Sequence, residues 1–535
     1  MLFRIMRSAK KRNKAAPTEP GRRMLDRLQR RPAAFSSNFD VRRLCAARLE
    51  ETSALMSWPA IRSDSDVLRA LVIGVGLCWS VAFVAIALRY ELELYADGAM
   101  FSYAVAVQDV WAFHWHNISG RLSVFLLSLL PAEIYVGLSG NPGAGIVVYG
   151  LLFYLAPLAG LIGTFAADRS RGRIIFVYAC GSTALLCPLV FGFPTEMWLA
   201  HAVFWPALAV SHYAKRTVVA TALVFVMVLA LAFTHEGALV LAFAIVATLA
   251  PRGWRDASFL RAAAVLVVVL AMSAAAKILL PPDEYYAGVL VRAALHFFDL
   301  TIFQVSVVLL LFAALAGYGV VFMGLSRLAP DRAYLYAAAI VVPALAIYWL
   351  WFDHTIHASS RYYLRTALVI VTPAFGALAV LYAMYGDSRL RFPLPGLQRV
   401  MTAARKRGAR PLAAAFMLLT LVHVIETGKF VAAWRDYRTA VAALAMGDDS
   451  DPALGNPHFV SSDRIASNLN RLSWFSTTPY LSVIVANFKP NRLVIDPAGN
   501  YFWLSCATAT ANAKAARAVP EEGRDLVRIY SCLHR

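Results

Sequence analysis

The chain has 535 residues, of which 59% are hydrophobic, and its mean hydropathy is +0.59. It contains many apolar runs of roughly 17 to 25 residues, the length needed to cross about 30 Å of hydrocarbon. These runs are apolar on every face, which excludes a β-barrel, whose strands alternate apolar and polar residues. The sequence therefore predicts an all-α polytopic membrane protein.

The net charge of +19 comes from basic residues that lie in clusters. Residues 1–69 contain "AKKRNK", "GRRMLDRLQRR" and "DVRRLCAAR", and the segment near residue 400 contains "RVMTAARKRGAR". Basic clusters beside membrane spans fix topology and contact anionic lipid, so this charge does not indicate nucleic-acid binding. We expect residues 1–69 to form a basic cytoplasmic tail.

The apolar runs predict a membrane module over residues 70–427 with about eleven crossings. The expected spans are residues 70–88, 144–167, 174–192, 197–213, 217–234, 236–250, 262–280, 301–325, 334–351, 366–385 and 411–427. With the tail in the cytoplasm, the basic connections "DRSRGR", "KR", "PRGWRDASFLR" and "SRLAPDR" and the loop 386–410 all fall inside. This arrangement is the one that the positive-inside rule requires.

Residues 89–142 are expected to form one large external loop with helices at the membrane interface. Within it, "LSVFLLSLLPAEIYVGL" (122–138) is apolar enough to resemble a span. A crossing here would invert every later loop and place Arg169, Arg171 and Arg173 outside. It would also place Glu133 in the membrane, at a cost of about 3 kcal/mol. We therefore expect a helix that lies along the outer interface.

Residues 428–535 change character and predict a small extracytoplasmic α/β domain. Turn signals such as "DDSDPALGNP" and "DPAGN" separate short runs that read as strands, namely "YLSVIVAN", "NRLVID", "NYFWLSC" and "LVRIYSC". Cys506 and Cys532 both lie in this segment, which the topology places in an oxidising compartment. A disulfide between them is therefore expected.

The connections on the outer side repeatedly carry carboxylates, imidazoles and guanidinium groups at the membrane edge. Ionisable groups are expensive at that depth and therefore indicate function. The candidates are Asp97, His114, His116, Arg121, Glu196, His235, Glu236, Asp283, Glu284, Asp353, His354, His357, Arg361 and Arg365.

A structural role is the alternative for each candidate. Asp97 could cap the helix that begins "DGAMFSYAVAV", and Glu196 could simply pair with an interfacial arginine. His114 and His116 fit an aromatic belt at headgroup level. The arginines could reach lipid headgroups.

The sequence resembles the GT-C superfamily of integral membrane glycosyltransferases. The resemblance rests on a first span, a long external loop with an acidic residue, Asp97 in "YADGAMF", and a second acid in the next external loop, Glu196 in "FPTEMW". The "NISGR" that ends at Arg121 is similar to an Asn-Gly-Arg-like element of some bacterial relatives, although Ser119 interrupts it. The resemblance to the GT-C superfamily covers the architecture of residues 70–430 and does not assign a specific family.

The resemblance implies transfer of a sugar from a polyprenyl-phosphate carrier to an extracytoplasmic glycan or lipid acceptor, with inversion. Asp97 would then be the base that removes the acceptor proton, and Glu196 would orient the acceptor, hold a sugar hydroxyl or share a metal. Candidates for binding the donor phosphate and the substrates are Arg121, His235, Glu236, His354, His357, Arg361 and Arg365. Arg361 and Arg365 are four residues apart and would share a helical face.

No tightly bound metal is expected, because a lipid monophosphate donor requires no cation and no spacing here is diagnostic of zinc. His235, Glu236, His354, His357 and Asp97 nevertheless offer enough nitrogen and oxygen ligands for a divalent cation. The Ala-, Val- and Arg-rich composition indicates a GC-rich bacterial genome, so the expected location is the bacterial inner membrane, with the amino terminus cytoplasmic and the carboxyl terminus periplasmic.

Two other classes share the hydropathy pattern. A transporter or lipid flippase would place charges or helix breaks in the middle of its spans and could show repeated halves. A polysaccharide polymerase or ligase would also act outside on a lipid-linked glycan, and residues 352–365 would be a short version of its late external loop rich in Arg and His.

Overall fold

The computed structural model describes residues 63–110, 121–189, 195–215, 217–281, 307–352, 362–385, 408–448, 458–470, 472–474 and 477–496, together with positions 287, 288, 291 and 295. Within these ranges the side chains of residues 186–189, 307–308 and 362–369 are not described. The expected cytoplasmic tail therefore lies outside the described residues, except for its last seven positions, 63–69. The described residues belong to one compact unit that begins at Ser63.

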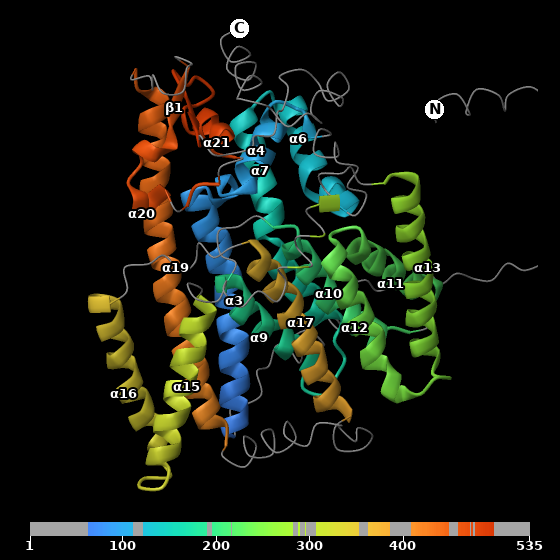
Figure 1. The fold of residues 1–535 in the computed structure, drawn as a ribbon. Helices are drawn as coiled ribbons and strands as arrows, with labels where there is room; N and C mark the ends of the chain where they lie inside the picture. Colours follow the sequence, from blue (N-terminus) through green and yellow to red (C-terminus); the bar gives the residue numbers. More distant parts are fainter. Residues whose placement is uncertain are drawn as a thin grey trace, which may run out of the picture. The chain divides into compact units, whose positions relative to one another are not determined.

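The described chain is mostly helical, and each expected span coincides with a helix or a helix pair (Figure 1). These helices are α3 (Asp64–Tyr90), α7 (Pro142–Tyr154) with α8 (Ala156–Ala167), α9 (Ile174–Leu189), α10 (Met197–Tyr213), α11 (Val218–Ala232), α12 (Leu239–Leu249), α13 (Ala257–Leu279), α15 (Val307–Leu325), α16 (Ala333–Ile347), α17 (Tyr362–Tyr385) and α19 (Ala409–Met446). The predicted helical character of this region is thus confirmed for the described residues.

Several helices are long and apolar enough to span a membrane. Among the described residues there are five such helices, or six if α7 and α8, which bend by 40° at their junction, form one broken span. Shorter apolar helices include Val218–Ala232 and Ile370–Tyr385. The expected number of about eleven crossings stays a prediction, because several helices are shorter than a membrane is thick.

Small residues let the central helices approach closely. A Cβ atom at Gly76 of α3 would lie 2.4 Å from the backbone oxygen of Cys180 in α9, and one at Gly160 of α8 would lie 2.7 Å from the backbone oxygen of Ala202 in α10. Such small-residue contacts are typical of helices that associate inside lipid, where van der Waals packing replaces the hydrophobic effect. Any larger side chain at Gly76 or Gly160 would force these backbones apart.

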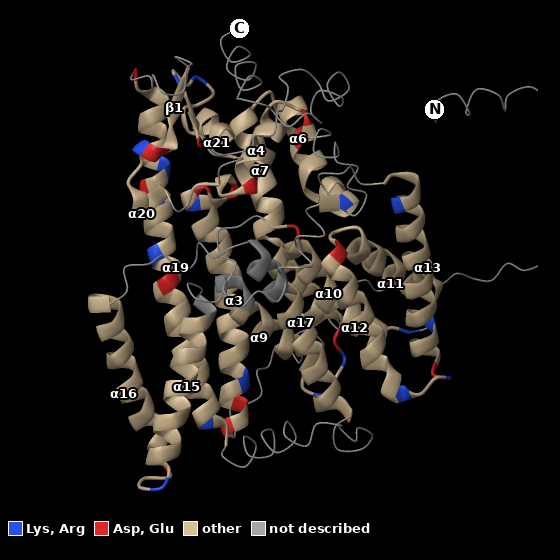
Figure 2. Cartoon of the chain, viewed as in Figure 1, with Lys and Arg blue, Asp and Glu red and all other residues tan. Residues whose placement is uncertain are grey.

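Charged side chains gather toward the two ends of the bundle and are sparse between them (Figure 2). One end of the bundle, which we call the basic end, carries the connections after α8, α10, α12 and α15. The starts of α3 and α19 lie at the same end. Arg410 pairs with Asp64 at 3.0 Å, and Arg252 donates to the Tyr385 hydroxyl at 3.0 Å. The described connections after α8, α12 and α15 therefore lie at one end of the helices, as expected, whereas residues 386–407 of the last basic loop lie outside the described residues.

The opposite end, the site end, carries the elements that follow α3. These are the 3-10 turn η2 (Leu92–Leu94), α4 (Asp97–Ala106), and one helical stretch formed by α5 (Leu122–Val124), the π-helical turn η5 (Phe125–Leu129) and α6 (Leu130–Ser139). Ser123 donates its backbone N–H to the carbonyl of Phe233 at 2.9 Å, and Ser139 leads through Gly140 and Asn141 into α7.

The stretch Leu122–Ser139 meets the length and hydropathy criteria for a span. Its first residues nevertheless adjoin the end of α11, and its last residues adjoin the start of α7, which descends from the site end (Figure 1). Figure 1 shows this stretch running obliquely from beside α11 up to the start of α7. The expected interface helix stays a prediction.

Helices α15, α16 and the first half of α19 share a second hydrophobic cluster beside the main one, built on Leu310, Tyr318, Ala337 and Val422. The Tyr318 hydroxyl donates to the carbonyl of Pro411 at 3.1 Å, which ties this group of helices to the basic end. Helix α16 ends in a π-helical turn, η9 (Tyr348–Phe352).

The start expected for the C-terminal domain differs from what is observed. Helix α19 continues through Gly428 to Met446, because its second half buries an apolar face that includes Phe430, Trp434, Tyr437 and Val441. The break expected at residue 428 is therefore absent from this helix.

Beyond α19, the described residues contain two short parallel strands, β1 (Phe459–Ser461) and β2 (Leu493–Ile495), in which Val460 pairs with Val494. Two short helices, α20 (Ser467–Asn470) and α21 (Thr478–Val485), lie between them. The strand expected in "NRLVID" is confirmed, whereas "YLSVIVAN" is wrong as a strand and forms most of α21. The runs "NYFWLSC" and "LVRIYSC", with Cys506 and Cys532, lie outside the described residues.

Candidate functional site

The site begins where the backbone leaves α3. Glu91 (φ 53°) and Ala96 (φ 54°, ψ −131°) both adopt positive φ, which is rare for residues other than glycine. The cost of such strain, about 1–3 kcal/mol per residue, is typically found at functional sites. The two turns fold η2 back over the end of α3 and begin α4 at Asp97.

Asp97 is the first residue of α4, and the residue at the capping position is Ala96. The capping role considered for Asp97 is therefore not the one observed. The Asp97 side chain is half-buried and lies at the positive end of the α4 dipole, which stabilises its negative charge.

Arg121 and Glu196 form an ion pair across the site, although they are 75 residues apart in sequence. Arg121 directly precedes α5, and Glu196 directly precedes α10. Their side chains are only 11% and 10% exposed. The pairing of Glu196 with an arginine, considered above as its structural role, is thus confirmed, and its partner is another of the candidate site residues.

His235 and Glu236 join this pair from the turn between α11 and α12. The His235 Nδ1 accepts the backbone N–H of Gly237 at 3.0 Å, so the neutral imidazole carries its proton on Nε2. Glu236 Oε1 accepts from Lys277 Nζ at 3.5 Å, near the end of α13. The sequence analysis had not included Lys277 among the candidates.

The charges of these residues act on one another. Burial, reinforced by the nearby positive charge of Arg121, lowers the pKa of His235, so this imidazole is neutral at pH 7. Burial alone would raise the pKa of Glu236, but the interactions with His235, Arg121 and Lys277 outweigh it and lower that pKa. Glu236 is therefore ionised and balances the lysine.

Asp97 and Glu196 both act electrostatically on Tyr149 of α7. The charges of Glu196, Asp97 and Glu93 all act on the Tyr149 hydroxyl, which is fully buried. Below these groups lies a layer of buried aromatic rings, in which Phe83 contacts Tyr154 at 5.1 Å and Trp198 at 5.0 Å between centroids. The two predicted catalytic acids therefore both lie near enough to Tyr149 for their charges to act on its hydroxyl.

The remaining candidates cannot be placed. His114, His116, Asp283, Glu284, Asp353, His354, His357 and Arg361 lie outside the described residues, and Arg365 lies in α17 where side chains are not described. The described structure therefore brings together Asp97, Arg121, Glu196, His235 and Glu236, and adds Glu93 and Lys277. Glu93 could have been noticed from its spacing, four residues before Asp97 in "ELELYAD".

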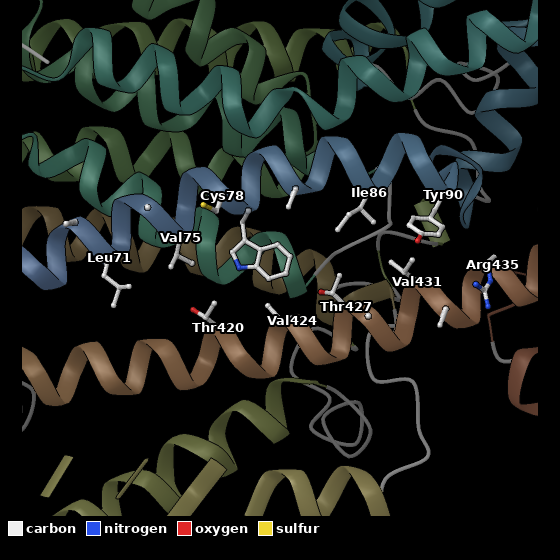
Figure 3. Close-up of a pocket in the computed structure, with 16 residues that line it drawn as sticks. Leu71, Val75, Cys78, Ile86, Tyr90, Thr420, Val424, Thr427, Val431 and Arg435 are labelled. Atoms are coloured by element: carbon white, nitrogen blue, oxygen red, sulfur yellow. The ribbon is translucent and has the colours of Figure 1, made fainter. Parts of the chain in front are cut away.

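An apolar cavity of about 800 Å³ lies elsewhere, between α3 and α19 (Figure 3). Its lining includes Leu71, Trp79, Val424 and Val431, with Tyr90 and Arg435 toward one end. None of the ion-paired residues of the site lines this cavity. It can hold hydrocarbon, but it offers no group for acid or base chemistry.

In the part of the chain that the structure describes, no group of three or more His, Cys, Asp or Glu side chains is arranged to hold a metal ion. The expectation of metal-independent chemistry stays a prediction, because His354 and His357 are outside that part.

No family model matches this chain, and neither a curated protein nor a solved structure matches it significantly. The functional argument therefore depends on the chemistry of the site itself.

Proposed function

We propose that this protein is a membrane glycosyltransferase of the GT-C type, which moves a sugar from a polyprenyl-phosphate carrier to a glycan or lipid acceptor outside the cytoplasm. The observation that carries the proposal is the convergence, at one end of an apolar helix bundle, of the half-buried carboxylate of Asp97 with two cations, the largely buried Arg121 and the more exposed Lys277, and with their counter-ions. Inverting transfer requires a carboxylate base beside cations for the leaving phosphate.

In this reaction Asp97 accepts the proton of the acceptor hydroxyl while that oxygen attacks the anomeric carbon. The bond between the anomeric carbon and the phosphate oxygen breaks with inversion, and its electron pair leaves on the polyprenyl phosphate. Arg121 and Lys277 stabilise the negative charge that develops on this phosphate. The neutral His235 can donate a hydrogen bond from Nε2 to a sugar or phosphate oxygen.

The charge balance of the site explains how it would receive a phosphate. Before substrate binds, the two cations Arg121 and Lys277 are matched by Glu196 and Glu236. A phosphate that enters competes with Glu196 for the guanidinium group, whose planar fork binds phosphate and carboxylate in the same way. Glu196 is then released toward the acceptor, which is the role expected for it.

The donor is a lipid in this proposal because the site lies at the end of apolar helices rather than in a soluble domain. The cavity between α3 and α19 offers apolar space for part of a hydrocarbon chain and reaches Tyr90, three residues before Glu93. A soluble nucleotide sugar would use neither feature.

We place the basic end in the cytoplasm and the site end outside, in the inner membrane of a bacterium, because basic connections remain on the cytoplasmic side. Single cysteines test this assignment. A membrane-impermeant maleimide should label Asn141→Cys in intact cells, and should label Arg255→Cys only after permeabilisation. Both positions are exposed, at opposite ends of the bundle. The reverse labelling pattern would place the site in the cytoplasm and remove the lipid-linked donor from consideration.

One observation favours the transporter alternative. Helix α19 buries His423 and Glu426, and Glu426 Oε1 accepts from Trp349 Nε1 at 2.9 Å and from Lys429 Nζ at 3.3 Å. Ionisable groups inside spans are typical of transport pathways. The two functions separate in detergent, where an enzyme consumes a lipid-linked sugar without any gradient, whereas a transporter needs a sealed vesicle.

A further inference from the structure

Glu93 is a buried carboxyl group that the proposed reaction does not use. It lies on η2 and is 1% exposed, and its Oε2 has no hydrogen-bond partner among the described residues. The side chain packs against Gly150 of α7, where an added Cβ would lie 3.2 Å from Oε2. An unpartnered buried carboxyl is costly, so its retention requires an explanation.

Two phenol groups share this environment. The hydroxyls of Tyr149 and Tyr154 are buried and likewise have no hydrogen-bond partner in the described part of the chain. Glu93 acts electrostatically on both of them, and Tyr149 also interacts with Asp97 and Glu196. Glu93, Tyr149 and Tyr154 are therefore three buried polar groups that interact electrostatically, and Tyr149 also interacts with the two candidate catalytic carboxylates.

The charge state of Glu93 follows from its surroundings. Burial raises the pKa of Glu93 to about 8, with the negative charge of Glu91 as a smaller contribution, against the opposing effects of a backbone hydrogen bond and of Arg438 from α19. Glu93 also interacts with Tyr149 and Tyr154 on α7, and Tyr149 in turn interacts with Asp97 on α4 and with Glu196, which directly precedes α10. Glu93 is thus protonated at neutral pH, and a protonated carboxyl can donate a hydrogen bond.

We propose that Glu93 is a positioning residue, whose protonated carboxyl holds Tyr149 through one buried water, so that the phenol O–H is directed as a hydrogen-bond donor toward Asp97 and Glu196. The proposal rests on the glycosyltransferase function proposed above. A fixed donor keeps the base ionised and oriented, which is the contribution of preorganised groups around a reacting centre.

Ionisation of Glu93 would reverse this arrangement. The Glu93 carboxylate would then accept a hydrogen bond from the Tyr149 hydroxyl, and this hydroxyl would turn away from Asp97. Transfer should therefore decline as the pH rises through about 8, the pKa of Glu93. In Glu93→Gln the amide keeps a donor and cannot ionise, so this variant should retain most of the neutral rate and lose the alkaline decline. Glu93→Ala should lower the rate by about 10- to 100-fold.

Matched variants separate positioning from a structural role. Tyr149→Phe should reduce transfer, and adding Glu93→Ala to it should cause no further loss, because both residues act through one path. Glu91→Gln removes a charge that helps to raise the pKa of Glu93, so it should move the alkaline decline to lower pH without abolishing it. An unchanged decline in Glu93→Gln, or additive losses in the double variant, would overturn the proposal.

A measurement that does not depend on activity keeps this test separate from the proposed function. The wild-type protein should show an infrared band of a protonated carboxyl group that disappears as the pH rises through about 8, and Glu93→Gln should lack it. If that band titrates as expected but no sugar is transferred, the glycosyltransferase assignment fails while the state of Glu93 stands. If transfer occurs but the band is the same in wild type and Glu93→Gln, the positioning role fails.

Discussion

Replacing Asp97 by asparagine should lower the rate of sugar transfer by about 10²- to 10⁴-fold, the contribution typical of a general base. The amide is nearly isosteric with the carboxyl group but does not accept a proton from the acceptor hydroxyl. Because Asp97 is half-buried at the first turn of α4, the substitution removes a favourable charge from the helix dipole, at about 0.3–1 kcal/mol, and should leave the fold intact. The rate is measured with purified protein and a lipid-linked donor.

Asp436→Asn is the matched control for that experiment. Asp436 lies on α19 in an exposed ion pair with Arg435, and its side chain is 52% exposed. Loss of an exposed pair changes stability by about 0–1 kcal/mol at most, and transfer should be unaffected. If Asp97→Asn retained a turnover close to that of the Asp436 control, Asp97 would not be the base.

Arg121→Met should cost about 3–5 kcal/mol of stability and also abolish donor binding. The stability loss arises because Glu196, 10% exposed, would be left as a buried charge without its ion-pair partner. Thermal unfolding in detergent reports the first effect, and binding of a polyprenyl-phosphate sugar reports the second. Lys277→Met should weaken donor binding with a smaller change in stability, since its pair with Glu236 is longer and more exposed.

The double variant Arg121→Met/Glu196→Gln separates the two consequences. With both charges removed, no uncompensated ion remains, so stability should return toward that of the wild type. Donor binding should not return, because the guanidinium group is still absent. Restored binding in the double variant would show that Arg121 serves only to neutralise Glu196, and it would remove this arginine from the phosphate site.

The sequence predicted the helices well because their signal is local. A run such as 217–234 is apolar throughout, and α11 occupies Val218–Ala232 within it. The extent of α19 was not predictable in this way, because Lys429, Arg435 and Arg438 make its second half look soluble. That half is helical because Phe430 and Trp434 pack against Tyr95. For α21, the short apolar run "YLSVIV" shows no hydrophobic periodicity that distinguishes a helix from a strand, and its β-branched residues favoured the strand that was predicted.

The sequence predicted which residues belong to the site, but it did not predict which of them form ion pairs with one another. Position at the outer membrane edge selected Asp97, Arg121, Glu196, His235 and Glu236, and the described structure places them at one end of the bundle. The pairing of Arg121 with Glu196 depends on how α5 and α10 pack and leaves no local trace in sequence. Lys277 was overlooked because a lysine at the end of a span is ordinarily explained by snorkelling.

The most direct measurement of the central claim is turnover of a lipid-linked sugar by the full-length protein purified in detergent, with no membrane gradient present. Polyprenyl-phosphate sugars are supplied as donors, extracted envelope glycolipids as acceptors, and the Asp97→Asn variant as the blank. The proposed function predicts release of polyprenyl phosphate together with a glycosylated acceptor, in wild type alone. Donors that stay intact in detergent, and change sides only when the protein is in sealed vesicles, would contradict it and identify a transporter.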